Sequence, residues 1–392
     1  MVRFLPVLFL LIIIGAAMRD DFAITLVYLF LAAILAGSWW SKRSLAQVTQ
    51  ERRMNSHAFL DEKVPVRLKF QNQGWLPVLW LNIQDELPVA LSTNPNFSRV
   101  TSLAPHAAIQ FDYTLEARTR GYYPIGPLVT STGDILGLHN QQQKKAAAHY
   151  LTVYPRIVPL TFVHIPSHSP QGTLRHHQPV YEDPTRIFSK REYTPGDSLR
   201  RVDWKASAAS GRLQVKLFEP SISLETFIFL DLNAENYAQR GRFDATELAV
   251  VVAASLAAWV SSKSQSVGLN VNGKDPLAGV PRMLPPNRGQ AHLVRLLEVL
   301  ARVEMNVGKS LTALIHRQRY SLAWGSTLIV ITGRAEDLLL EELYQARRAG
   351  QEAMLILVGQ GGYSQELARR AALLGILLVC IASLRDLDIW RR

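Results

Sequence analysis

The sequence predicts a multidomain protein with an N-terminal transmembrane α-hairpin, an all-β sandwich and a C-terminal α/β domain. Three observations predict this fold class. Two uncharged apolar runs open the chain, a central region alternates apolar and polar residues, and the C-terminal part alternates short apolar strands with helices. The 392 residues are enough for two or three domains. We place the boundaries at the changes of pattern, which gives residues 1–43, 44–150, 151–222 and 223–392.

The first 40 residues contain two candidate membrane spans. Residues 4–18 and 22–40 carry no charge, and Arg19-Asp20-Asp21 separates them. A helix rises about 1.5 Å per residue, so the second run is long enough to cross a hydrocarbon core of ~30 Å. Trp39-Trp40 ends this run, where indole rings favour the membrane interface. A cleaved signal peptide, with residues 16–18 as its cleavage region, is the alternative for the first run.

Basic residues predict the orientation of the chain. Lys42, Arg43, Arg52 and Arg53 follow the second run, whereas the loop between the runs carries Arg19 beside two aspartates. The positive-inside rule then places both termini and the soluble body in the cytoplasm, with two spans in the cell inner (plasma) membrane. The net charge of +11 is dispersed along the chain. This favours a lipid bilayer as the anionic partner and argues against nucleic acid.

The single cysteine, Cys380, excludes an internal disulfide and a cysteine-based zinc cluster. It stands in the apolar run 376–381, so we expect it to be buried as a small hydrophobic residue. A body without disulfides agrees with a cytoplasmic location.

Residues 45–150 show the patterns of β-structure. Residues 64–70 alternate apolar and polar side chains, and Asn72-Gln73-Gly74 follows as a turn. We expect further strands at residues 79–83, 108–117 and 128–130. A small antiparallel sandwich is the architecture that fits them.

A connector rich in Pro, His and Ser follows at residues 155–180. It contains His164, His168, His176 and His177. Histidines bind metals, but this spacing matches no compact ligand set. We interpret the connector as an exposed linker.

The C-terminal part alternates apolar strands and helices. The expected strands are residues 226–230, 267–271, 327–331, 354–358 and 376–381, and the expected helices are residues 245–262, 290–303, 336–350 and 365–374. This order predicts a mainly parallel sheet with helices on both faces.

The signature of the domain of unknown function 58 family resembles the segment Arg191-Glu192-Tyr193-Thr194-Pro195-Gly196-Asp197-Ser198-Leu199-Arg200-Arg201-Val202-Asp203-Trp204-Lys205-Ala206-Ser207-Ala208. Residues 213–219 resemble its continuation, and residues 119–127 and 133–138 resemble the β domain of that family. The resemblance implies a hairpin, a β-sandwich and a Rossmann-like von Willebrand factor A-like domain. It also implies a MoxR-type AAA+ ATPase and a transglutaminase-like membrane protein as partners, since such proteins are often encoded together. It implies no established activity.

The factor A-like fold holds a divalent cation in many proteins, through Asp-x-Ser-x-Ser, a Thr and an Asp from three loops. The residues that match the first loop are Asp231, Asn233 and Glu235, and a hard cation accepts such oxygen ligands. Thr332-Gly333 and 287–289 (Asn-Arg-Gly) depart from the other two loops. We expect no cofactor, with Mg²⁺ as the alternative. Without a metal, Asp231 would cap a helix or line the crevice at the strand ends.

The charged segment gives the candidate partner-binding residues, which are Arg191, Asp197, Arg200, Arg201, Asp203, Trp204 and Lys205. One hypothesis is a docking surface for a protein partner or an anionic ligand. The other is an internal network that pairs Arg191, Arg200 and Arg201 with Glu192, Asp197 and Asp203, with Trp204 stacked on a guanidinium. We favour the network and keep the docking surface open.

Residues 359–362 (Gly-Gln-Gly-Gly) follow a strand and invite a dinucleotide-binding interpretation, but Ser364 replaces the third glycine. A strand-to-helix turn explains them better. The sequence contains no nucleophile elbow, His-Glu-x-x-His or phosphate-binding loop, so we do not expect an enzyme.

The sequence therefore predicts a membrane-anchored adaptor or scaffold that recruits partner proteins through the factor A-like domain. The alternatives are a divalent-metal-dependent binding module and a cell-envelope enzyme of unknown reaction.

Overall fold

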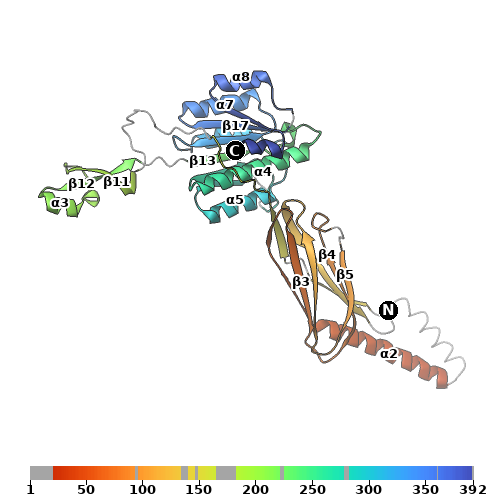
Figure 1. Ribbon diagram of the computed structural model, residues 1–392. Helices are drawn as coiled ribbons and strands as arrows, with labels where there is room; N and C mark the ends of the chain where they lie inside the picture. The colour runs from red at the N-terminus through yellow and green to blue at the C-terminus, as the bar shows by residue number, and fades with distance from the viewer. Residues whose placement is uncertain are drawn as a thin grey trace. The chain divides into compact units, whose positions relative to one another are not determined.

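The computed structural model describes residues 21–92, 96–133, 140–145, 149–164, 182–220, 225–277, 282–359 and 361–390. The chain divides into two compact units, Met1–Pro155 and Arg156–Arg392. In the described residues, the first unit combines an apolar helix with β-strands, and the second unit combines strands and helices (Figure 1). The mixed α/β fold class is therefore confirmed, and the finer subdivision into four segments stays a prediction.

Helix α2 (Asp21–Ala46) contains the second predicted span and continues past it. Its segment Ile24–Ala46 is long and apolar enough to cross a membrane, as an anchor or as a signal sequence. Its last turns pack against β4, β8 and β9 of the first unit. The first predicted span, residues 4–18, lies outside the described residues, so the two-span topology stays a prediction.

Ten strands of the first unit form three sheets within the described residues. They are β1 (Val48–Met54), β2 (His57–Phe59), β3 (Lys63–Asn72), β4 (Val78–Glu86), β5 (Asn96–Leu103), β6 (Ala108–Glu116), β7 (Gly121–Ile125), β8 (Leu128–Gly133), β9 (Asn140–Lys145) and β10 (His149–Tyr154). The sheet orders are β1-β3-β6, β2-β10-β7 and β5-β4-β8-β9, and every pairing is antiparallel except β2 with β10.

Side-chain alternation explains why these strands share one core. In β3 the even-numbered residues from Val64 to Phe70 are buried and the odd-numbered residues are exposed, as the sequence predicts. The buried side chains meet those of β4, β8 and β10 in one hydrophobic cluster, which includes Leu81, Ile83 and Leu151.

A hairpin arm (residues 182–220) is the first part of the second unit with described secondary structure. It consists of β11 (Glu182–Glu192), the 3₁₀ turn η1 (Leu199–Arg201), helix α3 (Trp204–Ser210) and β12 (Gln214–Pro220). Strands β11 and β12 pair antiparallel. The arm therefore contains the whole charged segment of the sequence.

A larger sheet follows in the second unit, with the described strands in the order β15-β14-β13-β16-β17-β18. Its elements are β13 (Glu225–Leu230), η2 (Ala234–Asn236), α4 (Arg242–Ser262), β14 (Ser266–Val271), β15 (Arg282–Asn287), α5 (Gln290–Arg302), α6 (Leu311–Arg319), β16 (Thr327–Thr332), α7 (Asp337–Arg348), β17 (Glu352–Val358), α8 (Gln365–Leu373), β18 (Leu377–Ile381) and η3 (Leu384–Trp390). All pairings are parallel except that of the edge strand β15.

Helices cover both faces of this sheet. Helix α4 packs on β13, β14, β16 and β17 and also contacts α5, whereas α6, α7 and α8 pack on the other face through a second hydrophobic cluster. Figure 1 shows α4 and α5 on one side of the sheet and α7 and α8 on the other. Helix α4 is also long and apolar enough to cross a membrane, but most of it is buried here, which identifies it as a core helix.

One prediction about a single residue is wrong. Cys380 is exposed, because β18 is the edge strand of the sheet, so the prediction of a buried cysteine is wrong. The predicted turn at residues 359–362 follows the end of β17, and a Cβ atom on Gly362 would meet the carbonyl oxygen of Gly333 at 2.2 Å. This close approach of two backbones explains why a glycine stands there.

Among the connector histidines, His164 is exposed and the other three lie outside the described residues.

Candidate functional site

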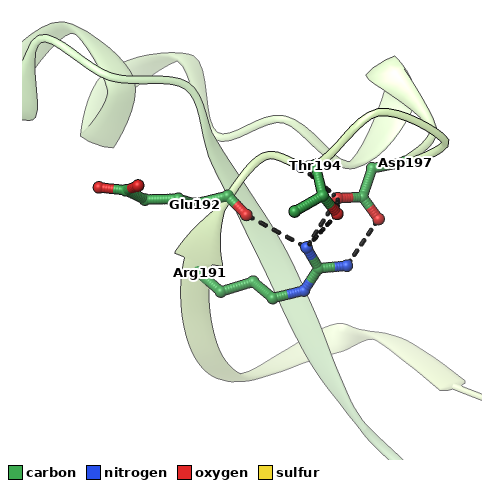
Figure 2. Close-up of polar contacts among 4 residues, drawn as sticks. All are labelled: Arg191, Glu192, Thr194 and Asp197. Carbon is green, nitrogen blue, oxygen red and sulfur yellow. Dashed lines mark hydrogen bonds and ion pairs between the residues drawn. The ribbon is translucent and has the colours of Figure 1, made fainter.

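The turn of the hairpin arm is held by Arg191 and Asp197. The guanidinium of Arg191 donates from Nη1 to Asp197 Oδ2 (2.7 Å) and from Nη2 to Asp197 Oδ1 (2.6 Å). Asp197 Oδ2 also accepts from the backbone nitrogen of Thr194 at 2.9 Å. Figure 2 shows this pair closing the loop between β11 and η1. A bidentate pair has a fixed geometry, so Arg191 holds the turn in one conformation.

These contacts lower the pKa of Asp197 well below its usual value. The hydrogen bond from Arg191 is the main cause, and the backbone hydrogen bond from Thr194 is the second. Both stabilise the ionised carboxylate. The turn therefore keeps its ion pair throughout the physiological pH range.

A second carboxylate, Asp203, begins helix α3. Its Oδ1 accepts from the backbone nitrogen of Ala206 at 3.2 Å, which is the N-cap interaction. Its Oδ2 lies 2.8 Å from Lys190 Nζ, and this contact with Lys190 is the main cause that lowers the pKa of Asp203. Asp203 therefore joins α3 to β11.

The arm thus contains an internal network, but its pairs differ in part from those predicted. Arg191 pairs with Asp197, and both belong to the predicted network, whereas Lys190 pairs with Asp203 and Arg212 pairs with Glu192 (2.8 Å). Neighbouring side chains on a strand point to opposite sides, so Lys190 and Arg191 reach different carboxylates. Alternation indicates that the two side chains diverge, but it does not indicate which carboxylate each of them reaches.

The remaining candidate residues of the arm lie on its surface. Arg200, Arg201 and Lys205 are exposed, and Trp204 is 66% exposed at the first position of α3. Leu199 beside them is 62% exposed. The described contacts of Trp204 include no stacking on a guanidinium, so the predicted stacking is not found. The candidates therefore separate into a group that holds the arm together and a group that faces solvent.

A second candidate site lies where the central strands of the large sheet end. Asp231, directly after β13, is buried and its carboxylate accepts four hydrogen bonds. Oδ1 accepts from the backbone nitrogen of Asn233 (2.9 Å) and from Asn272 Nδ2 (2.7 Å). Oδ2 accepts from Asn236 Nδ2 (2.6 Å) and from Thr332 Oγ1 (2.7 Å). We call Asp231 with these four partners the Asp231 hub.

The backbone fixes the orientation of Asn272 in this hub. Its Oδ1 accepts from the backbone nitrogen of Leu232 at 2.6 Å, and its Nδ2 donates also to the carbonyl oxygen of Lys309 at 2.9 Å. Asn272 consequently presents an amide nitrogen to Asp231 and not an oxygen. The hydroxyl of Tyr237 donates to the backbone oxygen of Asp231, and burial raises the pKa of Tyr237 well above its usual value.

The donor set of the Asp231 hub does not suit a hard cation. Such an ion needs several oxygen ligands, and here N–H and O–H donors occupy both oxygens of the carboxylate. Asn233 Oδ1 accepts from the backbone nitrogen of Glu235 at 3.3 Å and so caps η2, while Glu235 is exposed. The described residues contain no group of three or more His, Cys, Asp or Glu side chains placed to hold a metal.

One family model matches a segment that includes most of the arm and part of the large sheet. Residues 189–351 match the family model described as protein of unknown function DUF58. This is the family that the charged segment resembles, and the match covers less than half of the chain. The chain is also 26% identical over 282 residues to the uncharacterized protein YeaD of Bacillus subtilis (strain 168), which covers 70% of this chain and 67% of that protein.

Solved structures resemble the chain only distantly. Proximal thread matrix protein 1 from the mussel byssus is 13% identical with a TM-score of 0.33, and the match covers 43% of this chain and 46% of that one. The chain thus spans less than half of the mussel protein. An inactive mutant of a GH20 exo-β-N-acetylglucosaminidase from Vibrio harveyi is 9% identical with a TM-score of 0.20, over 83% of this chain and 59% of the other. Neither likeness carries an argument about function.

Proposed function

We propose that this protein is a membrane-anchored adaptor that recruits partner proteins at the cytoplasmic face of the inner membrane. Helix α2 would hold the protein in the bilayer, with the preceding apolar run as a second span. Residues 223–392, which we interpret as a von Willebrand factor A-like domain, and the hairpin arm that precedes them would provide the recruiting surface. A MoxR-type AAA+ ATPase and a transglutaminase-like membrane protein are the partners that the family resemblance suggests.

The exposed face of the hairpin arm is the observation that carries this proposal. Its carboxylates are engaged inside the arm, since Asp197 holds Arg191 and Asp203 holds Lys190. Leu199, Arg200 and Trp204 remain on the outside. A rigid support that presents an exposed tryptophan beside arginine has the composition of a protein-binding hot spot. Large exposed apolar residues of this kind are characteristic of interaction surfaces.

Affinity capture from native membranes tests the proposal. We expect the full-length tagged protein to retain a specific set of partners. The variant with Trp204→Ala and Arg200→Ala should recover these partners in amounts reduced by about tenfold or more, because losing one hot spot costs at least ~1.4 kcal/mol of binding free energy. Phe243→Ala is the matched control, because Phe243 is an exposed aromatic residue in the first turn of α4. The adaptor proposal fails if all three proteins retain the same partners or none.

A divalent-metal-dependent binding module is the second candidate function. The position of Asp231 favours it, because ligands of open α/β sheets bind at the carboxyl ends of the strands. The hydrogen-bond donors around the carboxylate oppose it. Calorimetry of the full-length protein with Mg²⁺, Ca²⁺ or Mn²⁺ decides, with Asp231→Asn as the matched control. We expect the same heats for both proteins. Binding that Asp231→Asn abolishes would establish the metal module instead.

A further inference from the structure

The loop between β3 and β4 lies along the last turns of helix α2. The backbone nitrogen of Gln73 donates to the carbonyl oxygen of Gln47 at 3.0 Å. Four residues later, the carbonyl oxygen of Pro77 accepts from the indole nitrogen of Trp40 at 3.1 Å. Trp40 precedes Gln47 by about 10 Å along a helix axis. The loop therefore runs back along α2 towards the apolar part of the helix.

One buried side chain holds this loop in a single conformation. Asn72 accepts at Oδ1 from the backbone nitrogen of Gly74 (3.0 Å), and its Nδ2 donates to the carbonyl oxygens of Leu76 (2.8 Å) and Ala104 (3.2 Å). The side chain of Leu76 is fully buried in the first unit. Asn72 forms hydrogen bonds with backbone groups of the loop from the interior of the unit, so the loop is a rigid part of the fold.

Two large apolar side chains point outward on either side of Pro77. Trp75 is 64% exposed and Leu79 is 41% exposed. Each is two residues from Pro77, so each α-carbon lies within about 7 Å of that residue's α-carbon. They consequently lie near the level of Trp40 on the helix axis. Exposing a tryptophan on a rigid loop and a leucine at the start of β4 is unfavourable in water unless another surface covers them.

The neighbouring residues of α2 indicate which surface this is. Leu35 and Trp39 are exposed on the helix just before this level, and Lys42 and Arg43 are exposed just after it. A helix that leaves a bilayer with anionic lipids typically shows this order: apolar residues come first, tryptophan follows, and basic residues come last. Trp75 and Leu79 extend this apolar-to-basic boundary from the helix onto the first unit.

We propose that Trp75 and Leu79 insert into the membrane interface and form a second bilayer contact, which seats the first unit on the lipid surface. This inference rests on the proposed anchoring of the protein by α2. The helix fixes the protein in the bilayer, and the loop fixes the tilt of the first unit against it. Tryptophan and leucine suit this role because the indole ring prefers the headgroup region and the leucine side chain is apolar.

Fluorescent labels in vesicles test the proposal. Cys380→Ser removes the native cysteine of the full-length protein. Four variants are then made, each with one new cysteine in place of Trp75, Leu79, Leu35 or Val89, and each cysteine is labelled with an environment-sensitive dye. Each labelled protein is reconstituted in vesicles of phosphatidylcholine and phosphatidylglycerol. Val89 is the matched control, since it is exposed and follows the far end of β4, a strand that spans roughly 27 Å from Val78 to Glu86. We expect lipids with a nitroxide near the headgroup to quench the labels at positions 75 and 79, and aqueous iodide to quench only the label at position 89.

The four labels separate the possible failures. If iodide quenches the labels at 75 and 79 as strongly as the label at 89 while lipid quenches the label at 35, the second contact is wrong and the anchor stands. If neither iodide nor lipid quenches the labels at 75 and 79, a protein surface covers the loop and the lipid contact is wrong. If iodide quenches the label at 35, the anchoring by α2 fails, and the second contact fails with it.

Discussion

Asp85→Ala is expected to destabilise the first unit by about 3–5 kcal/mol, because it leaves the guanidinium of Arg52 buried without its carboxylate. The side chains of Arg52 and Asp85 form an ion pair and are 4% and 0% exposed. Arg52 also donates to the carbonyl oxygen of Ile125 at 2.8 Å, and the hydroxyl of Tyr113 donates to Asp85 at 2.8 Å. Burial and the charge of Asp85 raise the pKa of Tyr113 above its usual value.

Denaturant unfolding of the full-length protein measures this effect. The control is Asp112→Ala, which breaks the pair with Arg67 on the surface of the same unit, where both side chains are about 60% exposed. A surface pair contributes about 0–1 kcal/mol, so the control is expected to change little. The double variant with Arg52→Leu and Asp85→Leu is expected to recover part of the loss, since it removes both charges. Equal losses for Asp85→Ala and Asp112→Ala would contradict the buried-pair explanation.

Asp231→Ala is expected to destabilise the second unit by about 3 kcal/mol or more, because four hydrogen-bond donors lose their acceptor in the interior. The hub also joins three strand ends, since Asp231 follows β13, Asn272 follows β14 and Thr332 ends β16. Removing the carboxylate therefore weakens the sheet at the point where its central strands meet. Thermal unfolding in a buffer without divalent cations measures the loss.

Asp337→Ala provides the comparison for Asp231→Ala. Asp337 also stands in the second unit, but its side chain is 79% exposed and pairs with Arg370 on the surface. We expect a change of less than about 1 kcal/mol for this variant. A melting temperature of Asp231→Ala that matches that of Asp337→Ala would show that the hub contributes no stability. A wild-type protein that gains stability from added Mg²⁺ while Asp231→Ala does not would favour the metal module.

Hydrophobic patterns predicted the regular elements well where burial alone decides the structure. The alternation in β3 and the continuous apolar runs of β16 and β17 were predicted within two residues of their bounds. Strand β15 was missed, because it contains Pro285-Pro286, and prolines in a sheet are confined to edge strands such as this one. The exposed Cys380 was mispredicted for a related reason, since a sequence run does not reveal which strand is at the edge.

The candidate sites were predicted in part. Asp231 was identified from its place after a strand, but Asn272 was missed, although it directly follows the apolar run 267–271. Strands β13 and β14 pair in parallel with Leu230 opposite Val271, so the residues after them become neighbours only in the folded sheet. In the arm, the sequence predicted a charged network of three arginines and three carboxylates without assigning the individual pairs. Which cation serves which carboxylate depends on the strand register, and no spacing rule in the sequence gives that.

The junction between α2 and β1 has a mechanical consequence. Only Gln47 separates the end of the helix at Ala46 from the start of β1 at Val48, and Gln47 itself is bonded to Gln73. The protein therefore has no flexible linker between α2 and β1. In a bilayer, a thicker membrane or a neighbouring helix can change the tilt or the rotation of α2. Any such change would reorient the first unit by the same angle.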